Sequence, residues 1–316
     1  MLDQTLLERP ATVPENSGRN LKISQRLKRL LPYAFVMPPA AYLLVFMFWP
    51  LGKQIYLSLT RTRLANPNRS TFIGLGNYER LFANPDFYSV LKITLIYSVM
   101  AVVIGVAVGL IAALALNRPF RGRTMVRGIL LFGWAVPNVA AALVWLWIFN
   151  ERSGVLNTIV TGLGLERISW LTSTQMALPS ILLVTVWQVA PFVMLVMLAA
   201  LQSVPEEVKE AALVDGADKL SVFRAVTLPH IMPTLQLVAL LVMVWSIRRF
   251  DIIYLLTGGG PVGSTSTLIV KLRQVAFENH DLGLSSAYGV VGLILALSIA
   301  AIHALFNHRR QKSSSR

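Results

Sequence analysis

The chain of 316 residues is 55% hydrophobic and only 14% charged. Soluble domains carry about 25% charged residues, so this composition excludes an ordinary soluble domain. The long apolar blocks predict a membrane protein. The net charge of +14 does not indicate nucleic-acid binding, because the basic residues cluster in short segments between apolar blocks. With no cysteine, the chain can form neither a disulfide nor a thiolate metal site.

The apolar blocks predict an all-α, polytopic membrane fold with six spanning helices, since helices satisfy their own backbone hydrogen bonds in lipid. We expect residues 1–31 to be an N-terminal tail, 32–308 the membrane domain and 309–316 a C-terminal tail. In the second span, Gly105 and Gly109 have the spacing of a close helix contact. The expected spans are roughly Tyr33–Leu57, Val90–Leu116, Gly128–Phe149, Leu178–Leu201, Ile231–Leu256 and Ser286–Phe306.

The distribution of lysine and arginine predicts the orientation of these spans. The two tails and two alternate loops hold 17 of these residues, whereas the other three loops hold 8. The positive-inside rule therefore places both termini in the cytoplasm. The first outer loop fits least well, because it contains four arginines, at positions 61, 63, 69 and 80.

The chain lacks the common signatures of catalysis. The segment "GGGPVGST" at 258–265 resembles a phosphate-binding loop but has no lysine. There is no H-E-x-x-H or G-x-S-x-G pattern, and the four histidines are scattered without metal-ligand spacing. We therefore expect no enzyme activity and no metal site in this chain.

The loop after the fourth span, residues 202–229, is too long for a simple connection. Glu206 and Glu207 after Pro205 predict a helix start, and Ala211 and Ala212 favour a helix. Gly216 then ends the run, and a second short helix is expected over 220–226, before Leu228 and Pro229 lead into the fifth span. A helix resting on lipid headgroups is the alternative, but the loop has five acids against three bases, whereas such helices are basic.

At this loop the sequence resembles a known family. "EAALVDGADKLSVFRAVTLP" (210–229) is similar to the EAA loop of ABC-importer permeases, with Val226 in place of the usual isoleucine. Segments 72–98, 121–150 and 250–261 resemble the maltose-type carbohydrate permeases, so the likeness covers most of the chain.

The resemblance implies a permease subunit in a bacterial inner membrane that translocates a sugar or sugar derivative. Its implied partners are a second homologous permease, two cytoplasmic ATPases that bind ATP and Mg²⁺, and an extracytoplasmic binding protein. This chain would bind no cofactor itself. The implied ATPase-coupling residues are Glu210, Ala211, Ala212, Gly216, Leu228 and Pro229. A stand-alone secondary transporter and a non-transporting membrane scaffold are the alternative classes.

Three charged residues near the end of the fifth span are costly in hydrocarbon and therefore mark a candidate site. Arg248, Arg249 and Asp251 either reach the substrate cavity, with Asp251 fixing an arginine, or pair internally and extend to the membrane surface. Adjacent helical residues point about 100° apart, so the two arginines are expected to differ in role. A guanidinium binds sugar hydroxyls, and it binds a carboxylate or sulfonate in bidentate fashion. An anionic or sulfonated sugar is thus the less favoured alternative to a neutral one.

Weaker substrate-binding candidates are Trp187, Gln188, Ser286 and Tyr288, for which helix packing is the more favoured interpretation.

Overall fold

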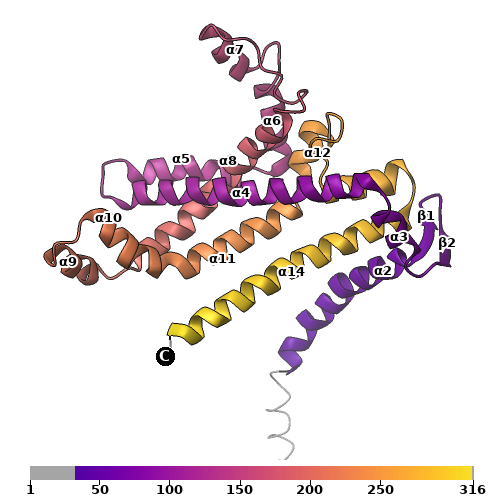
Figure 1. Cartoon of the computed structure of the whole chain (residues 1–316), viewed down its shortest axis with the longest axis horizontal. Coiled ribbons are helices and arrows are strands. Elements are labelled where there is room, and N and C mark those ends of the chain that lie inside the picture. Colours follow the sequence, from indigo (N-terminus) through magenta and orange to yellow (C-terminus); the bar gives the residue numbers. More distant parts are fainter. Residues whose placement is uncertain (1–32, 315–316) are drawn as a thin grey trace, which may run out of the picture. The chain divides into compact units, whose positions relative to one another are not determined.

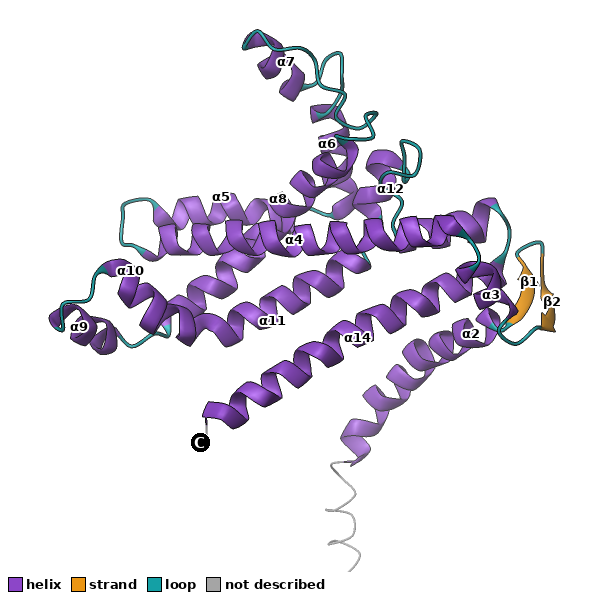
Figure 2. Cartoon of the chain, in the orientation of Figure 1, coloured by secondary structure: helices purple, strands orange, loops and turns teal. Residues whose placement is uncertain are grey.

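The computed structural model describes residues 33–314, with side chains described up to residue 305 (Figure 1). It is predominantly helical, with one small antiparallel hairpin (Figure 2). The chain divides into two units, Met1–Gln54 and Ile55–Arg316. The expected N-terminal tail lies outside the described residues. Of the expected C-terminal tail, only the helical backbone as far as Ser314 is described.

The first unit is helical from Tyr33 onward and contains a π-helical turn, η1 (Leu44–Phe48). Helix α2 (Trp49–Ser58) follows this turn and crosses the boundary between the two units. Apolar side chains such as Phe35 and Phe46 are exposed along it. The stretch Tyr33–Ser58 has the length and hydropathy of a membrane span. A helix that is apolar all round suits contact with lipid or another chain.

The second unit holds the other elements. The hairpin consists of β1 (Thr60–Arg63) and β2 (Asn66–Phe72). The helices before the long inner loop are α3 (Gly76–Phe82), α4 (Pro85–Asn117), α5 (Arg123–Ala135), α6 (Asn138–Ile148), α7 (Val155–Gly162) and α8 (Ala177–Gln202). Those that follow are α9 (Glu206–Val214), α10 (Lys219–Val222), η2 (Phe223–Thr227), α11 (Leu228–Ile247), α12 (Asp251–Thr257), α13 (Leu268–Arg273), η3 (Gln274–Glu278) and α14 (Leu282–Ser314).

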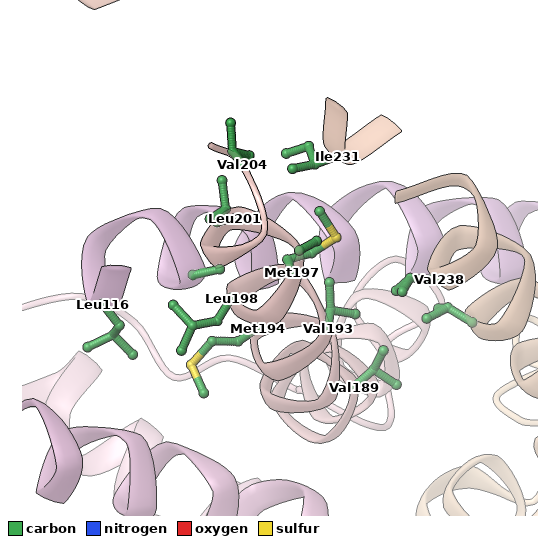
Figure 3. Close-up of a cluster of buried hydrophobic side chains, with 13 residues drawn as sticks. Leu116, Val189, Val193, Met194, Met197, Leu198, Leu201, Val204, Ile231 and Val238 are labelled. Atoms are coloured by element: carbon green, nitrogen blue, oxygen red, sulfur yellow. The ribbon is translucent and has the colours of Figure 1, made fainter. Parts of the chain in front are cut away.

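Helix α8 is the centre of this unit. In its most apolar stretch 72% of residues are buried, against 28% for α4 and 11% for α14. Helices α4, α5 and α11 pack against it. Figure 3 shows one of the resulting apolar clusters, in which Val193, Met194 and Met197 of α8 meet Leu116 of α4 and Val238 of α11.

The expected glycine contact lies between α4 and α8. A Cβ at Gly109 would lie 2.5 Å from Cβ of Val193 and 2.8 Å from the carbonyl oxygen of Ala190, so only glycine fits. At Gly105 the nearest atom would be a Val189 methyl at 3.6 Å, an ordinary contact distance. Gly109 therefore sets how closely α4 and α8 approach.

The third span is not the single helix expected over 128–149. It is broken into α5 and α6, which meet at 99°. Pro137 lies in the break with extended backbone. Proline has no N–H for a helical bond and disfavours helical geometry in the residue before it, so Val136 is extended as well. Five single helices and this bent pair account for the six spans.

The fifth span also differs from the continuous helix expected over 231–256. A single long helix begins at Lys219 and ends at Ile247. Arg248, Arg249 and Phe250 then interrupt it before α12. The expected second short helix of the inner loop is therefore the first part of this span, joined through the π-helical turn η2.

We predict that Gly109→Ala destabilises the folded chain by about 1–3 kcal/mol, because an extra methyl forces the packed helices apart. Gly105→Ala is the matched control one helical turn away and should be neutral or slightly stabilising, since alanine favours helix. Thermal unfolding of the purified variants in one detergent measures this. Equal unfolding midpoints for the two variants would contradict the prediction.

Candidate functional site

Polar side chains gather where the two broken spans meet. Helix α12 packs against α6, and both begin directly after a break (Figure 1). The break before α12 holds Arg248 and Arg249, and α12 itself begins with Asp251. Helix α6 begins with Asn138, and the neighbouring α8 contributes Gln188.

Four of these side chains form one hydrogen-bonded chain. Nη1 of Arg249 donates to Oε1 of Gln188 at 2.6 Å. Nε2 of Gln188 donates to Oδ1 of Asn138 at 3.3 Å, and Nδ2 of Asn138 donates to Oδ2 of Asp251 at 3.2 Å. The cation and the carboxylate are thus linked through two neutral amides.

This series of hydrogen bonds uses only one N–H donor of the Arg249 guanidinium and leaves the others free. Gln188 is 3% exposed, whereas Arg249 and Asp251 are half-buried and Asn138 is exposed. A guanidinium has five N–H donors, and a single side-chain hydrogen bond of Arg249 is found within residues 33–305. In the same range no carboxylate forms an ion pair with it. A half-buried cation without a counter-ion can bind an anion or several hydroxyls.

No ion pair joins Asp251 to an arginine within residues 33–305, and Asp251 is linked to Arg249 only through Gln188 and Asn138. Asn138 occupies the position between them. Sequence reasoning missed Asn138 because it lies inside a predicted continuous span. The available signal was Pro137 directly before it, which marks a helix start rather than a helix interior.

The two arginines have different surroundings. Arg248 is exposed, and its side chain has no hydrogen-bond or ion-pair partner among the residues with described side chains. Arg249 is fixed by Gln188. Of the two, Arg249 is the one that the fold holds in place.

The other candidates divide between this region and a separate cluster. The ring of Trp187 packs edge-on against Trp145 with centroids 5.7 Å apart, beside the polar chain. Tyr288 is 2% exposed and packs against Phe87 in another apolar cluster. Ser286, two residues before it, is half-buried. No hydrogen bond in the described part of the chain joins Ser286 or Tyr288 to the polar chain.

Aromatic rings that sequence reasoning did not select form a row across three helices. Trp134 of α5 stacks on Phe192 of α8 with centroids 5.8 Å apart, and Phe192 contacts Trp245 of α11 at 4.9 Å. Trp134 and Trp245 are exposed. Such rings offer apolar faces on which a sugar ring can stack.

The loop of residues 202–229 presents α9 as an uncovered helix. None of its side chains is buried, and Val214 is 87% exposed. Glu210 and Ala211 are exposed, and Ala212 is half-buried. Small and apolar side chains beside acids on a free helix suit docking into a groove of another protein.

Both ends of the turn after α9 are fixed by local hydrogen bonds. Gly216 has a φ of +86°, and the N–H groups of Gly216 and Ala217 donate to the carbonyls of Leu213 and Ala212. This is the Schellman arrangement, which favours glycine at that position. Asp218 then caps α10 by accepting from the N–H of Ser221 at 3.0 Å.

Hydrogen bonds from Ser221, first from its hydroxyl and then from its backbone N–H, lower the pKa of Asp218. Because the pKa of Asp218 is lowered, the ionised cap stabilises the loop at any pH above the ordinary carboxyl pKa of about 3.9. That contribution is lost only as the pH falls through the lowered value. The cap is therefore ionised throughout the neutral range.

Comparison with known proteins agrees with this architecture. Residues 105–312 match the family described as "Binding-protein-dependent transport system inner membrane component". The chain is 35% identical to the trehalose/maltose transport system permease protein MalF of Thermococcus litoralis, over 86% of this chain and 92% of that protein. It is 34% identical to the sulfoquinovosyl glycerol transport system permease protein SmoG of Agrobacterium fabrum, over 87% and 89%.

The fold is also that of a solved transporter. A bacterial ABC transporter involved in the import of the acidic polysaccharide alginate matches with a TM-score of 0.79 at 24% identity, covering 91% of this chain and 99% of that one. The chain belongs to the family of inner membrane components of binding-protein-dependent transport systems. It is a multi-pass ABC transporter permease subunit and not an enzyme.

We predict that Asp218→Ala accelerates amide hydrogen exchange at residues 219–222, because the N–H of Ser221 loses its acceptor. Asp218→Asn should change little, since asparagine caps as well as aspartate. Exchange in α9 serves as the internal reference. Unchanged protection of Ser221 in the alanine variant would show that the cap does not order this helix.

Proposed function

We propose that this chain is the permease subunit of an ABC importer for a sugar derivative that carries an anionic group. The observation that carries the proposal is the half-buried Arg249, held by Gln188 at the meeting point of two broken helices without a carboxylate partner. Ionisable groups in membrane segments usually face a substrate path. The aromatic row of Trp134, Phe192 and Trp245 supplies stacking surfaces for the sugar ring.

Two relatives support the substrate class. One is named for sulfoquinovosyl glycerol, a sulfo sugar, and one for trehalose and maltose, which are neutral. Both names contain a sugar, so the relatives agree on that class of substrate. Arg249 is the residue that favours an anionic member of the class over a neutral one. The free donors of its guanidinium match the geometry of a carboxylate or sulfonate.

The same proposal states where the other subunits of the transporter would bind this chain. Both termini and the α9–α10 loop would lie in the cytoplasm, by the excess of basic residues there. Helix α9 would dock on a cytoplasmic ATPase through Glu210, Ala211 and Ala212, while Gly216, Leu228 and Pro229 shape the return of the chain to the membrane. ATP and Mg²⁺ would bind to two such ATPases. A second permease would complete the path, and a binding protein would deliver the sugar from outside.

Substitution of the arginines tests the substrate assignment. We expect Arg249→Gln to reduce uptake of the transported anionic sugar about 10–100-fold, which corresponds to the loss of a charged hydrogen bond of about 1.5–3 kcal/mol. Arg248→Gln, the matched control, should change uptake less than about twofold, as is usual for an exposed unpaired charge. Uptake by the reconstituted transporter is measured with a panel of uronate, sulfonate and neutral sugars.

Measurements with the same panel of sugars can also contradict the anionic assignment. Transport of neutral sugars alone by the natural sequence, with Arg249→Gln fully active, would remove the anionic assignment and leave the importer intact.

A second test concerns the coupling helix. We expect Ala211→Asp to abolish co-purification of the ATPase with the tagged chain, because a charge replaces a small side chain on the docking surface. Co-purification of the second permease should persist. Ala65→Asp, at an exposed alanine in the turn between β1 and β2, is the control and should retain both the ATPase and the second permease. ATPase retained at natural stoichiometry in Ala211→Asp would refute the assignment of α9.

A further inference from the structure

The β1–β2 hairpin carries an unusual concentration of unpaired positive charge. Arg61, Arg63 and Arg69 are exposed, and residues 59–78 contain no aspartate or glutamate. Their side chains form no hydrogen bond or ion pair with any residue whose side chain the structure describes. The nearby Arg80 is different, because it pairs with Asp281 at 3.1 Å.

Two of the three arginines share one face of β1, and the third lies on the paired strand. Along β1, Thr60 and Thr62 are buried while Arg61 and Arg63 are exposed. Arg61 lies opposite Thr71 and Arg63 opposite Asn66, and the register shifts between these two pairs. The exposed Arg69 lies in the shifted part of β2, next to them in the hairpin. We call the surface formed by Arg61, Arg63, Arg69 and Thr71 the arginine face.

The opposite face is fastened to the membrane domain. Nδ2 of Asn77 donates to the carbonyls of Ser58 at 2.9 Å and Thr60 at 2.8 Å. A Cβ at Gly283 of α14 would lie 2.1 Å from the carbonyl oxygen of Thr60, so strand and helix are in the closest possible contact. Arg63 also pairs through its backbone with Asp281. The arginine face is therefore presented by a fixed element.

We propose that the arginine face docks an acidic patch on the extracytoplasmic binding protein. The inference rests on the proposed function, which places the hairpin outside the membrane. Positive charge is disfavoured on that side during insertion, so three unpaired arginines call for a compensating partner. Guanidinium groups bind carboxylates in bidentate fashion, and complementary charge speeds and orients docking.

The composition of the arginine face favours a protein over lipid headgroups. Elements that bind membrane surfaces combine basic residues with apolar side chains that enter the bilayer. The arginine face has none, because its fourth member is Thr71. The apolar Phe72 lies opposite Thr60 and therefore on the other face of the hairpin, where its side chain is 65% exposed.

The experiment uses the complete transporter in nanodiscs and the purified binding protein of the same system, loaded with its sugar. ATPase activity is followed against the concentration of binding protein. We expect Arg61→Gln/Arg63→Gln to raise the half-saturating concentration about tenfold at low salt while the maximal rate is retained. Salt should raise the half-saturating concentration of the natural sequence toward that of the variant.

The matched control is Arg152→Gln/Arg167→Gln, which removes two exposed arginines from another loop on the same proposed side. It should leave the half-saturating concentration unchanged. Reversal of charge in Arg61→Glu, combined with lysine at the contacting acid of the binding protein, should restore docking.

Three results would overturn the inference: an unchanged half-saturating concentration in the hairpin variant, an equal rise in the control, or a rise that occurs only in anionic lipid and disappears in phosphatidylcholine nanodiscs. In each of these the natural sequence is still stimulated, so the proposed function survives. Failure of the binding protein to stimulate the natural sequence at all would instead refute the proposed function, and the inference with it.

Discussion

A helix in hydrocarbon must satisfy its own backbone hydrogen bonds, and this chain interrupts two spans at neighbouring places. One break follows Ala135 and the other follows Ile247. Interrupted backbone is tolerated at membrane depth only where protein or water surrounds it. The hydrogen-bonded chain from Arg249 to Asp251 lies at both breaks, so polar side chains and broken helices form one feature. The packing of α4, α5 and α11 on α8 brings these ends together.

One continuous helix links this feature to the turn that follows α9. The helix from Lys219 to Ile247 has 29 residues, which corresponds to about 43 Å at 1.5 Å per residue. Its first turn is capped by Asp218, and its last residue precedes Arg248. Displacement of α9 by a partner would therefore act on the start of this helix, and small sliding of packed helices is a common form of conformational change. The polar chain is where that movement would change hydrogen bonds.

Helix α9 and the turn after it could be predicted from sequence because local chemistry determines them. Proline, acids, alanines and Gly216 each act within a few residues of their own position. The breaks and Asn138 could not be predicted with the same method. Hydropathy averages over a window, so an apolar segment that turns by 99° gives the same signal as a straight one. Tyr288 illustrates the same limit, since only packing reveals that its ring is buried against Phe87.

The two amides between the charges determine what Arg249 can bind. If Asp251 paired directly with it, an incoming anion would have to break a half-buried ion pair, which is strongly unfavourable. Displacing the neutral Gln188 amide costs much less, because one uncharged hydrogen bond is exchanged for a charged one. The carboxylate of Asp251 remains at the other end of the chain and repels a second negative charge. It accepts hydrogen bonds instead, so the proposed site favours a substrate with its anionic group at Arg249 and a hydroxyl at Asp251.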